Sequence, residues 1–135
     1  MSTKKTIAII GALEEKGRKS VDQLAGAEVR LLLFYKESED PIATQQELAA
    51  QYPELDAVWI SCPIEASWEA DIIVLAIPPE EQPSVIASIK DVVTGKPVIE
   101  LDNEINSVRQ LITSLPYSTI LSASADNIKT VIQNI

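Results

Sequence analysis

The chain has 135 residues, of which 46% are hydrophobic, and it carries a net charge of −9 with one cysteine and no histidine. This length predicts a single domain, residues 1–135, with enough apolar side chains to form a folded core. The acidic balance argues against a nucleic-acid surface, one cysteine excludes an internal disulfide, and the lack of histidine removes most hydrolase triads and zinc sites.

Six short apolar runs along the chain predict β-strands. They lack the alternation of apolar and polar residues that marks a strand with one face in water, so we expect each strand to be covered on both faces, as in a parallel sheet. In chain order the predicted strands are Thr6–Ile10, Glu28–Tyr35, Ala57–Ile60, Ile72–Ile77, Val98–Leu101 and Thr119–Leu121.

Segments with helical spacing lie between these strands. Their apolar residues stand three and four positions apart, which places them along one side of a helix. The four stripes are Val21, Leu24 and Ala25; Val85, Ile86, Ile89, Val92 and Val93; Val108, Leu111, Ile112 and Leu115; and Ile128, Val131, Ile132 and Ile135. A short helix through Trp68 and a weaker helix within residues 36–56 complete the series. The alternation predicts an α/β fold, a doubly wound, mostly parallel six-stranded sheet with helices on both faces.

Glycines and polar residues mark the expected ends of these helices. Gly26 is expected to end the first helix, and Gly95 to end the helix before the fifth strand. Asp126 is expected to cap the last helix at its N-terminus.

The turn after the first strand is the primary candidate site, because ligands in such sheets bind outside the carboxyl ends of the strands. Its sequence over residues 9–20 is IIGALEEKGRKS. A Walker-type phosphate loop has four residues between its glycines, followed directly by a lysine. Here five residues separate Gly11 from Gly17, and Arg18 intrudes before Lys19. Both spacings argue against that kind of loop.

The segment Glu69–Asn103, with the sequence EADIIVLAIPPEEQPSVIASIKDVVTGKPVIELDN, supports a dinucleotide-binding interpretation. Its Ala-Asp lead-in, its apolar strand ending in Ile77 and Pro78, its amphipathic helix and its Gly-Lys-Pro turn follow a known family in order. From Lys5 to Asn103 the chain resembles the N-terminal NADP-binding domain of the deazaflavin-dependent NADP oxidoreductases. It is similar, more distantly, to the ketopantoate-reductase and 6-phosphogluconate-dehydrogenase type. The resemblance implies a Rossmann fold with NADP or NAD as the cofactor.

The resemblance also implies where the cofactor would lie and where this chain departs from the family. The family's glycine fingerprint lines up with Ala12, Glu14 and Gly17, with Gly11 just upstream, so only its last glycine survives. Together with Leu13, these turn residues are the implied contacts of the cofactor pyrophosphate. The middle fingerprint position approaches the pyrophosphate closely, which is why relatives have a glycine there.

Glu14 places both bulk and negative charge at that middle position. Two like charges about 4 Å apart repel by ~1 kcal/mol in water and by ~4 kcal/mol near a protein surface. Lys16, Arg18, Lys19 and the positive end of the following helix oppose this repulsion, each charge near a helix end contributing roughly 0.3–1 kcal/mol. These terms are comparable, so the sequence predicts weak cofactor binding or none, and an ordinary strand-to-helix turn is the alternative.

Further candidate contacts of the cofactor follow the second, fourth and fifth strands. By resemblance, Lys36 stands near the position where NADP-specific relatives hold the 2′-phosphate, although its acidic neighbours favour a solvated loop. Tyr35 either lies against the adenine or packs in the core. The remaining candidates at strand ends are Ile77, Pro78, Pro79 and Asp102. No catalytic residue and no metal ligand is predicted.

Three functions remain open at this point. The first is a stand-alone Rossmann-type domain that resembles the NADP-binding half of an oxidoreductase and does not catalyse alone, because that family takes its second half-site from a further domain. The second is an interaction or regulatory module that has lost the cofactor. The third is a coenzyme A-binding Rossmann domain, for which the Pro-Pro-Glu after the fourth strand is typical.

Binding partners and location are expected on general grounds. A homodimer or a partner protein would bury the exposed edges of a lone domain. No apolar run is long enough to span a bilayer, and the polar start of the chain is not a secretory signal. We therefore expect a cytoplasmic protein that binds neither nucleic acid nor membrane.

Overall fold

A computed structural model describes residues 4–101 and 105–135, in which strands and helices alternate. The strands are β1 (Lys5–Ile10), β2 (Val29–Phe34), β3 (Ala57–Ile60), β4 (Ile72–Leu75), β5 (Pro97–Glu100) and β6 (Thr119–Ser122). The helices are α1 (Glu15–Leu24), α2 (Ile42–Gln51), α3 (Pro63–Glu69), α4 (Gln82–Ile89), α5 (Ile105–Ser114) and α6 (Ile128–Gln133). None of the helices in this described part is long and apolar enough to cross a membrane.

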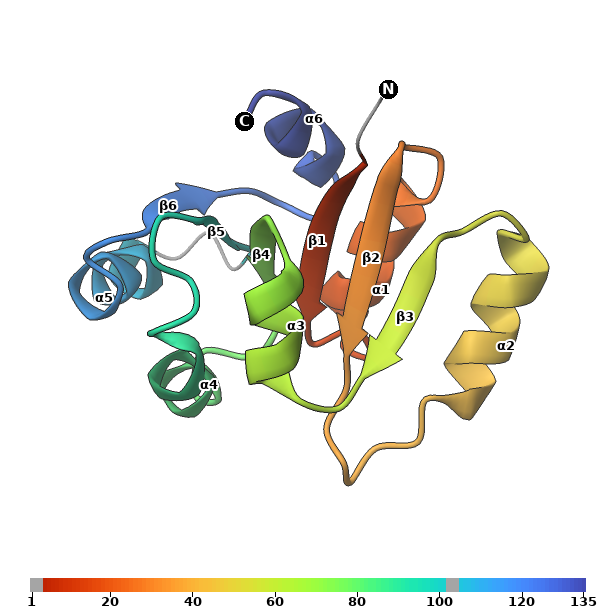
Figure 1. The fold of residues 1–135 in the computed structure, drawn as a ribbon, viewed down its shortest axis with the longest axis horizontal. Helices are drawn as coiled ribbons and strands as arrows, with labels where there is room; N and C mark the ends of the chain where they lie inside the picture. Colours follow the sequence, from red (N-terminus) through yellow and green to blue (C-terminus); the bar gives the residue numbers. More distant parts are fainter. Residues whose placement is uncertain (1–3, 102–104) are drawn as a thin grey trace.

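The six strands form one sheet in the order β3-β2-β1-β4-β5-β6, and every pair of neighbours is parallel (Figure 1). The predicted doubly wound sheet is confirmed. The strand order reverses direction between β1 and β4, and this switch point is where such folds hold ligands. Ile10 of β1 is in register with Phe34 of β2 and Leu75 of β4, so the carboxyl ends of these three strands lie side by side.

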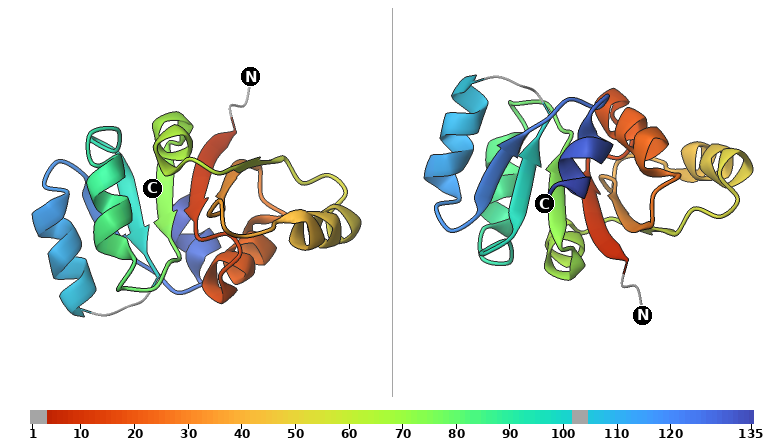
Figure 2. Two further views of the ribbon diagram at one scale, coloured as in Figure 1. Left: turned by 90° about the horizontal axis from the view of Figure 1, so that it is seen from below. Right: turned by 90° about the horizontal axis from the view of Figure 1, so that it is seen from above.

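Helices cover both faces of the sheet, as the two views in Figure 2 show. Side chains of α1, α2 and α6 pack on one face, and those of α3, α4 and α5 pack on the other. Along β1, Ile7 and Ile9 point into the first core, whereas Ala8 and Ile10 point into the second. Since both faces of the central strands are buried, their sequences show no alternation of apolar and polar residues.

The fourth helix and the fourth strand are shorter than predicted. α4 ends at Ile89, although the apolar stripe continues to Val93, which is fully buried without being helical. The prediction that Gly95 ends this helix is therefore wrong: Gly95 lies in the turn before β5, where it has a φ of +79° and donates its N–H to the Tyr117 carbonyl at 2.8 Å. β4 ends at Leu75, two residues before its predicted end.

The predicted caps are correct in one case and wrong in another. α1 ends at Leu24, shortly before Gly26, as predicted. The N-cap of α6 is Asn127 rather than Asp126. The Asn127 side-chain oxygen accepts the N–H of Ser124 at 2.8 Å and closes the turn before the helix. The helix therefore begins one residue later than predicted.

Candidate functional site

The turn between β1 and α1 is built on Gly11, which packs against the end of β4. Gly11 has a φ of +103°, a backbone conformation that residues with a side chain rarely adopt. A Cβ at this position would lie 2.9 Å from Ile77 Cγ2 and 3.1 Å from the Ala76 carbonyl carbon. Although Gly11 lies outside the aligned fingerprint, it therefore forms the tight turn that the first glycine of such fingerprints provides.

Gly17 lets the first helix pass directly over this turn. A Cβ on Gly17 would lie 2.0 Å from the Gly11 carbonyl oxygen and 3.1 Å from Ala12 Cα. The same oxygen accepts the Glu14 N–H at 3.0 Å, so the turn and the start of α1 are tied together. This close helix-to-strand packing is the role of the last glycine in dinucleotide-binding fingerprints. The backbone of this turn therefore requires glycine at positions 11 and 17.

Glu14 is the N-cap of α1, with φ −74° and ψ 157°, and its side chain makes no capping hydrogen bond. It is half-buried, as is Leu13, whereas Ala12 is buried and donates its N–H to the Phe34 carbonyl at 3.1 Å. A carboxylate at a helix N-terminus is favourable for the helix dipole. Glu14 also lines the cleft at this helix N-terminus, a place that favours the binding of phosphate.

An open cleft of about 370 Å³ lies between this turn and the loop that follows β4. The residues that line it are Glu14, Glu15, Lys16, Ala76, Ile77, Pro78, Pro79 and Glu80. Glu14 was predicted from the glycine turn, and the other candidates from the end of the fourth strand. The structure brings Glu14 together with Ile77, Pro78 and Pro79 in one cleft. The floor is fixed by β1 and β4, because the Ala76 N–H donates to the Ile10 carbonyl at 2.8 Å.

Lys36 follows β2 at the same edge of the sheet, and its ammonium forms an ion pair with the Glu81 carboxylate. Its backbone N–H donates to Glu39 Oε1 at 2.8 Å. The hydrogen bond that its ammonium donates to Glu81 raises the pKa of Lys36, and the negative charges of Glu81, Glu39 and Glu14 add to the effect. Acidic groups from three parts of the sequence, Glu14, Glu39 and Glu81, therefore act on the Lys36 ammonium.

Glu81 and Glu80 were not among the predicted site residues. Their signal in the sequence is the Pro-Pro-Glu-Glu run, which places two carboxylates just after a buried strand. Glu80 lines the cleft, and Glu81 faces Lys36.

Tyr35 packs against Trp59 of β3, with ring centroids 6.3 Å apart and planes inclined by 59°. Its N–H donates to the Ile60 carbonyl at 3.1 Å, which continues the pairing of β2 with β3. The ring is half-buried, and this contact corresponds to the packing interpretation of Tyr35. Asp102, the last predicted contact, lies outside the described residues.

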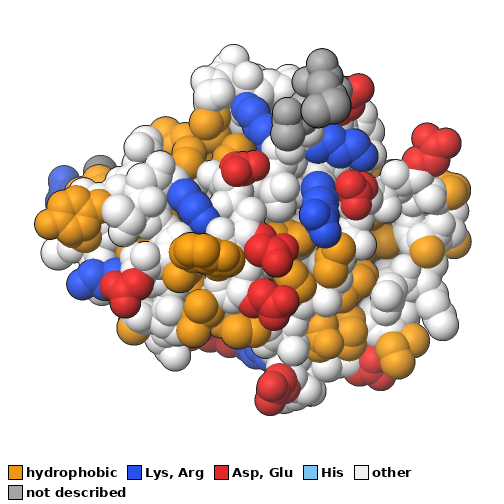
Figure 3. Space-filling model, viewed as in Figure 1, with side chains coloured by type: hydrophobic (Ala, Val, Ile, Leu, Met, Phe, Trp, Pro, Cys, Tyr) orange, Lys and Arg blue, Asp and Glu red, His pale blue; other side chains and the backbone are white. Residues whose placement is uncertain are grey.

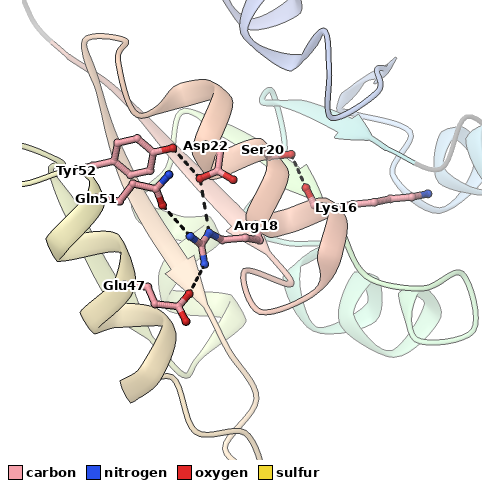
Figure 4. A network of polar contacts seen from close by, with 7 residues as sticks. All are labelled: Lys16, Arg18, Ser20, Asp22, Glu47, Gln51 and Tyr52. Carbon is pink, nitrogen blue, oxygen red and sulfur yellow. Dashed lines mark hydrogen bonds and ion pairs between the residues drawn. The ribbon is translucent and has the colours of Figure 1, made fainter.

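Arg18 and Lys19, both expected to offset Glu14, form ion pairs with other residues. Arg18 donates to Glu47 at 2.9 Å and to Gln51 at 3.1 Å, both on α2, and its Nε lies 3.6 Å from Asp22 (Figure 4). Lys19 pairs with Glu15 at 3.3 Å within α1. In Figure 4 the Lys16 side chain extends away from α2, and Lys16 lines the cleft. Successive helix residues differ by about 100° in direction, so positions 16 and 18 face opposite sides.

Glu100 is a further polar residue at this edge that the sequence pattern did not single out. It is fully buried at the end of β5, in register with Leu75 and Ser122. Its signal is a lone charge within an otherwise apolar strand. In residues 4–101 and 105–135, no group of three histidine, cysteine or acidic side chains is placed to hold a metal ion.

A second cavity, of about 300 Å³, opens at the amino-terminal ends of the strands, opposite the cleft. It is lined by Lys5, Leu24, Ala27, Glu28, Val29, Lys129, Ile132 and Gln133. Lys5 already donates to the carbonyl oxygens of Ile132 and Ile135 at the end of α6, at 3.2 and 3.3 Å. Doubly wound folds bind ligands at the carboxyl ends of their strands, so the cleft beside Gly11 is the candidate functional site.

The parallel sheet, its switch point and the glycine turn beside it define a Rossmann-type α/β domain. The sequence matches no protein-family model, and no curated protein is significantly similar to it. Solved structures do match. Lactate dehydrogenase from Eimeria maxima, solved with NADH and oxamate, superposes with a TM-score of 0.75 at 12% identity, over 92% of this chain and 44% of that one.

Two further solved structures share this fold. A putative F420-dependent NADP-reductase from Arthrobacter sp. FB24 has a TM-score of 0.68 at 13% identity, over 90% of this chain and 65% of that one. Shikimate dehydrogenase from Mycobacterium tuberculosis has a TM-score of 0.64 at 14% identity, over 90% of this chain and 46% of that one. The chain thus spans less than two thirds of each neighbour, and the likeness establishes the Rossmann fold implied by the sequence resemblance.

Proposed function

We propose that this chain is a dinucleotide-binding domain of the oxidoreductase type, which binds NADP or NAD weakly and does not catalyse alone. The observation that carries the proposal is the close-packed glycine turn at the switch point, where Gly17 passes over the Gly11 carbonyl. Its structural neighbours include a dehydrogenase solved with NADH and a putative NADP-reductase, which supports the same ligand class.

The tight glycine turn supports a pyrophosphate at this place, whereas the side chain of Glu14 opposes it. Gly11, Ala12, Leu13 and the start of α1 would hold the phosphates, and Ile77 to Pro79 would line the cleft. When bound, the dinucleotide would supply a hydride acceptor or donor. The half-buried Glu14 carboxylate would repel a single phosphate charge 4 Å away by ~4 kcal/mol. Lys16 and the helix dipole offset part of this repulsion.

A module that has lost the cofactor is the second candidate function. The Lys36–Glu81 pair favours it, because the basic group expected to contact a cofactor phosphate is already neutralised. Under either function we propose that the chain acts in the cytoplasm, as a homodimer or in a complex with a partner protein. Sedimentation of the purified chain would test self-association.

The proposal predicts that removing the charge of Glu14 strengthens dinucleotide binding. The experiment measures thermal unfolding of the wild type and Glu14→Gln with millimolar NADP, NAD or coenzyme A. A ligand at 100 times its Kd adds ~2.7 kcal/mol to the free energy of unfolding. We expect a small stabilisation of the wild type by NADP or NAD and a larger one of Glu14→Gln.

The matched control is Glu54→Gln, which removes the same charge at the opposite end of the sheet, in the loop before β3. It should leave the ligand-induced stabilisation as in the wild type. A stabilisation by coenzyme A alone would favour the coenzyme A-binding function. If none of the three ligands stabilises either protein, the chain is a module without a cofactor.

A further inference from the structure

The ion pair between Lys36 and Glu81, which we call the clasp, joins two of the three strand ends around the candidate site. Lys36 lies two residues after the end of β2, and Glu81 is the N-cap of α4 in the loop after β4, 45 positions along the chain. β1 lies between β2 and β4 in the sheet. The clasp therefore bridges the carboxyl end of β1, beside the Gly11 turn.

The clasp lies in acidic surroundings and within reach of a ligand. Glu39 accepts the backbone N–H of Lys36, and the carboxylates of Glu39 and Glu14 both act electrostatically on its ammonium. Lys36 thus has three acidic neighbours, of which Glu81 contacts the ammonium directly. The two clasp side chains are 42% and 31% exposed, so an anion from solvent can reach the pair. Such an anion must compete with the Glu81 carboxylate.

The backbone that carries Glu81 is held in place, which confines the competition to its side chain. The Glu81 N–H donates to the Pro78 carbonyl at 3.0 Å. The next residue, Gln82, is buried and donates from its side chain to the Ile77 carbonyl at 3.4 Å. Releasing Lys36 therefore requires rotation of the Glu81 side chain and no rearrangement of the loop.

We infer that Glu81 is an internal competitor for a ribose 2′-phosphate, which lowers the affinity of the site for NADP relative to NAD. The inference rests on the proposed function and deepens it. A phosphate on the 2′-oxygen would replace the Glu81 carboxylate on Lys36, one anion for another. NAD has a hydroxyl at that place, so it leaves the clasp closed. Glu81 thereby sets how the site discriminates between the two dinucleotides.

The experiment compares ligands that differ by the 2′-phosphate in variants that differ by one charge. Calorimetry would measure Kd for NADP and NAD, and for adenosine 2′,5′-bisphosphate and 5′-AMP. The two fragments lack the pyrophosphate that faces Glu14, so they test the clasp independently of the glycine turn. We expect Glu81→Gln to strengthen binding of each 2′-phosphorylated ligand about fivefold relative to its unphosphorylated counterpart, the scale of a surface ion pair.

Glu80→Gln is the matched control, because it removes the same charge one residue away and leaves the clasp intact. It should change the affinities of both members of a ligand pair by the same factor. Lys36→Met, combined with Glu81→Gln, should abolish the gain. Equal effects of Glu81→Gln and Glu80→Gln, or a gain that survives Lys36→Met, would overturn the inference.

Failure of the proposed function gives a different pattern. If the fragments bind with the expected dependence on Glu81 while neither dinucleotide binds, even to Glu14→Gln, then the clasp recognises a nucleotide phosphate and the dinucleotide function is wrong. If the dinucleotides bind but their ratio ignores Glu81, only the inference about the clasp is wrong. If Glu81→Gln binds no fragment at all, the inference is wrong as well.

Discussion

At the scale of single residues, Gly17 is the position where the site geometry depends most on the absence of a side chain. A Cβ there would stand 2.0 Å from the Gly11 carbonyl oxygen, a backbone atom that cannot rotate away. We expect Gly17→Ala to destabilise the protein by about 3 kcal/mol or more, since overpacking against a fixed backbone costs at least as much as core overpacking. Urea unfolding of the variant would measure this change.

Gly26→Ala is the matched control for that substitution. Gly26 has no atom within 4 Å of its notional Cβ and no positive φ. An alanine there should leave stability unchanged or raise it by up to about 1 kcal/mol, because it restricts the unfolded chain. If Gly17→Ala and Gly26→Ala unfold at the same urea concentration, the close approach of α1 to the turn is not essential.

At the scale of elements, polar contacts to α1 help to hold α2 on the domain. It lies beyond β3, at the edge of the molecule (Figures 1 and 2), and its buried residue is Leu48. Arg18 of α1 contacts Glu47 and Gln51 of this helix, and Tyr52, just after it, donates to Asp22 of α1 at 2.8 Å. The sequence predicted only a modest helix here because α2 has a weak apolar stripe, with Leu48 as its buried residue.

Removal of the Arg18 charge should therefore loosen α2 without unfolding the domain. Exposed ion pairs contribute about 0.2–1 kcal/mol each, so we expect Arg18→Met to lower the global free energy of unfolding by about 1 kcal/mol. Amide hydrogen exchange in α2 should become several times faster, while exchange in the central strands changes little. Lys19→Met is the control, since it removes an equal charge and an ion pair within α1. Equal exchange in α2 for both variants would contradict this role of Arg18.

The elements themselves were largely predictable, and the side-chain partners were not. Buried strands such as β1 and β4 are recognisable because both of their faces are apolar, a local property of the sequence. The partner of Lys36 lies 45 positions away, and no local pattern specifies which of several nearby carboxylates it meets. Arg18 was likewise expected to offset the charge of Glu14, but it contacts α2 instead. No local pattern could show this, because the position of α2 beside α1 depends on tertiary packing.

At the scale of the whole molecule, the net charge of −9 acts on any anionic ligand that approaches the cleft. Figure 3 shows acidic and basic side chains scattered among apolar ones on the face drawn there, with no broad basic patch among its described residues. The cleft itself presents Glu14, Glu15 and Glu80 beside Lys16. The long-range field of the protein therefore opposes binding of a dinucleotide.

This field predicts an unusual dependence of NADP binding on salt. The Debye length falls from about 30 Å at 0.01 M to about 8 Å at 0.15 M ionic strength, so added salt screens distant acidic groups from the ligand. We expect the Kd for NADP to fall about two- to fivefold between 10 and 150 mM sodium chloride, with a smaller change for NAD, which carries fewer charges. Calorimetric titrations at both salt concentrations would measure these changes. At a basic phosphate site, screening of attractive charges would instead raise the Kd. A rise in Kd with salt for both dinucleotides would mean that Lys16, Lys36 and the α1 dipole outweigh the acidic surface.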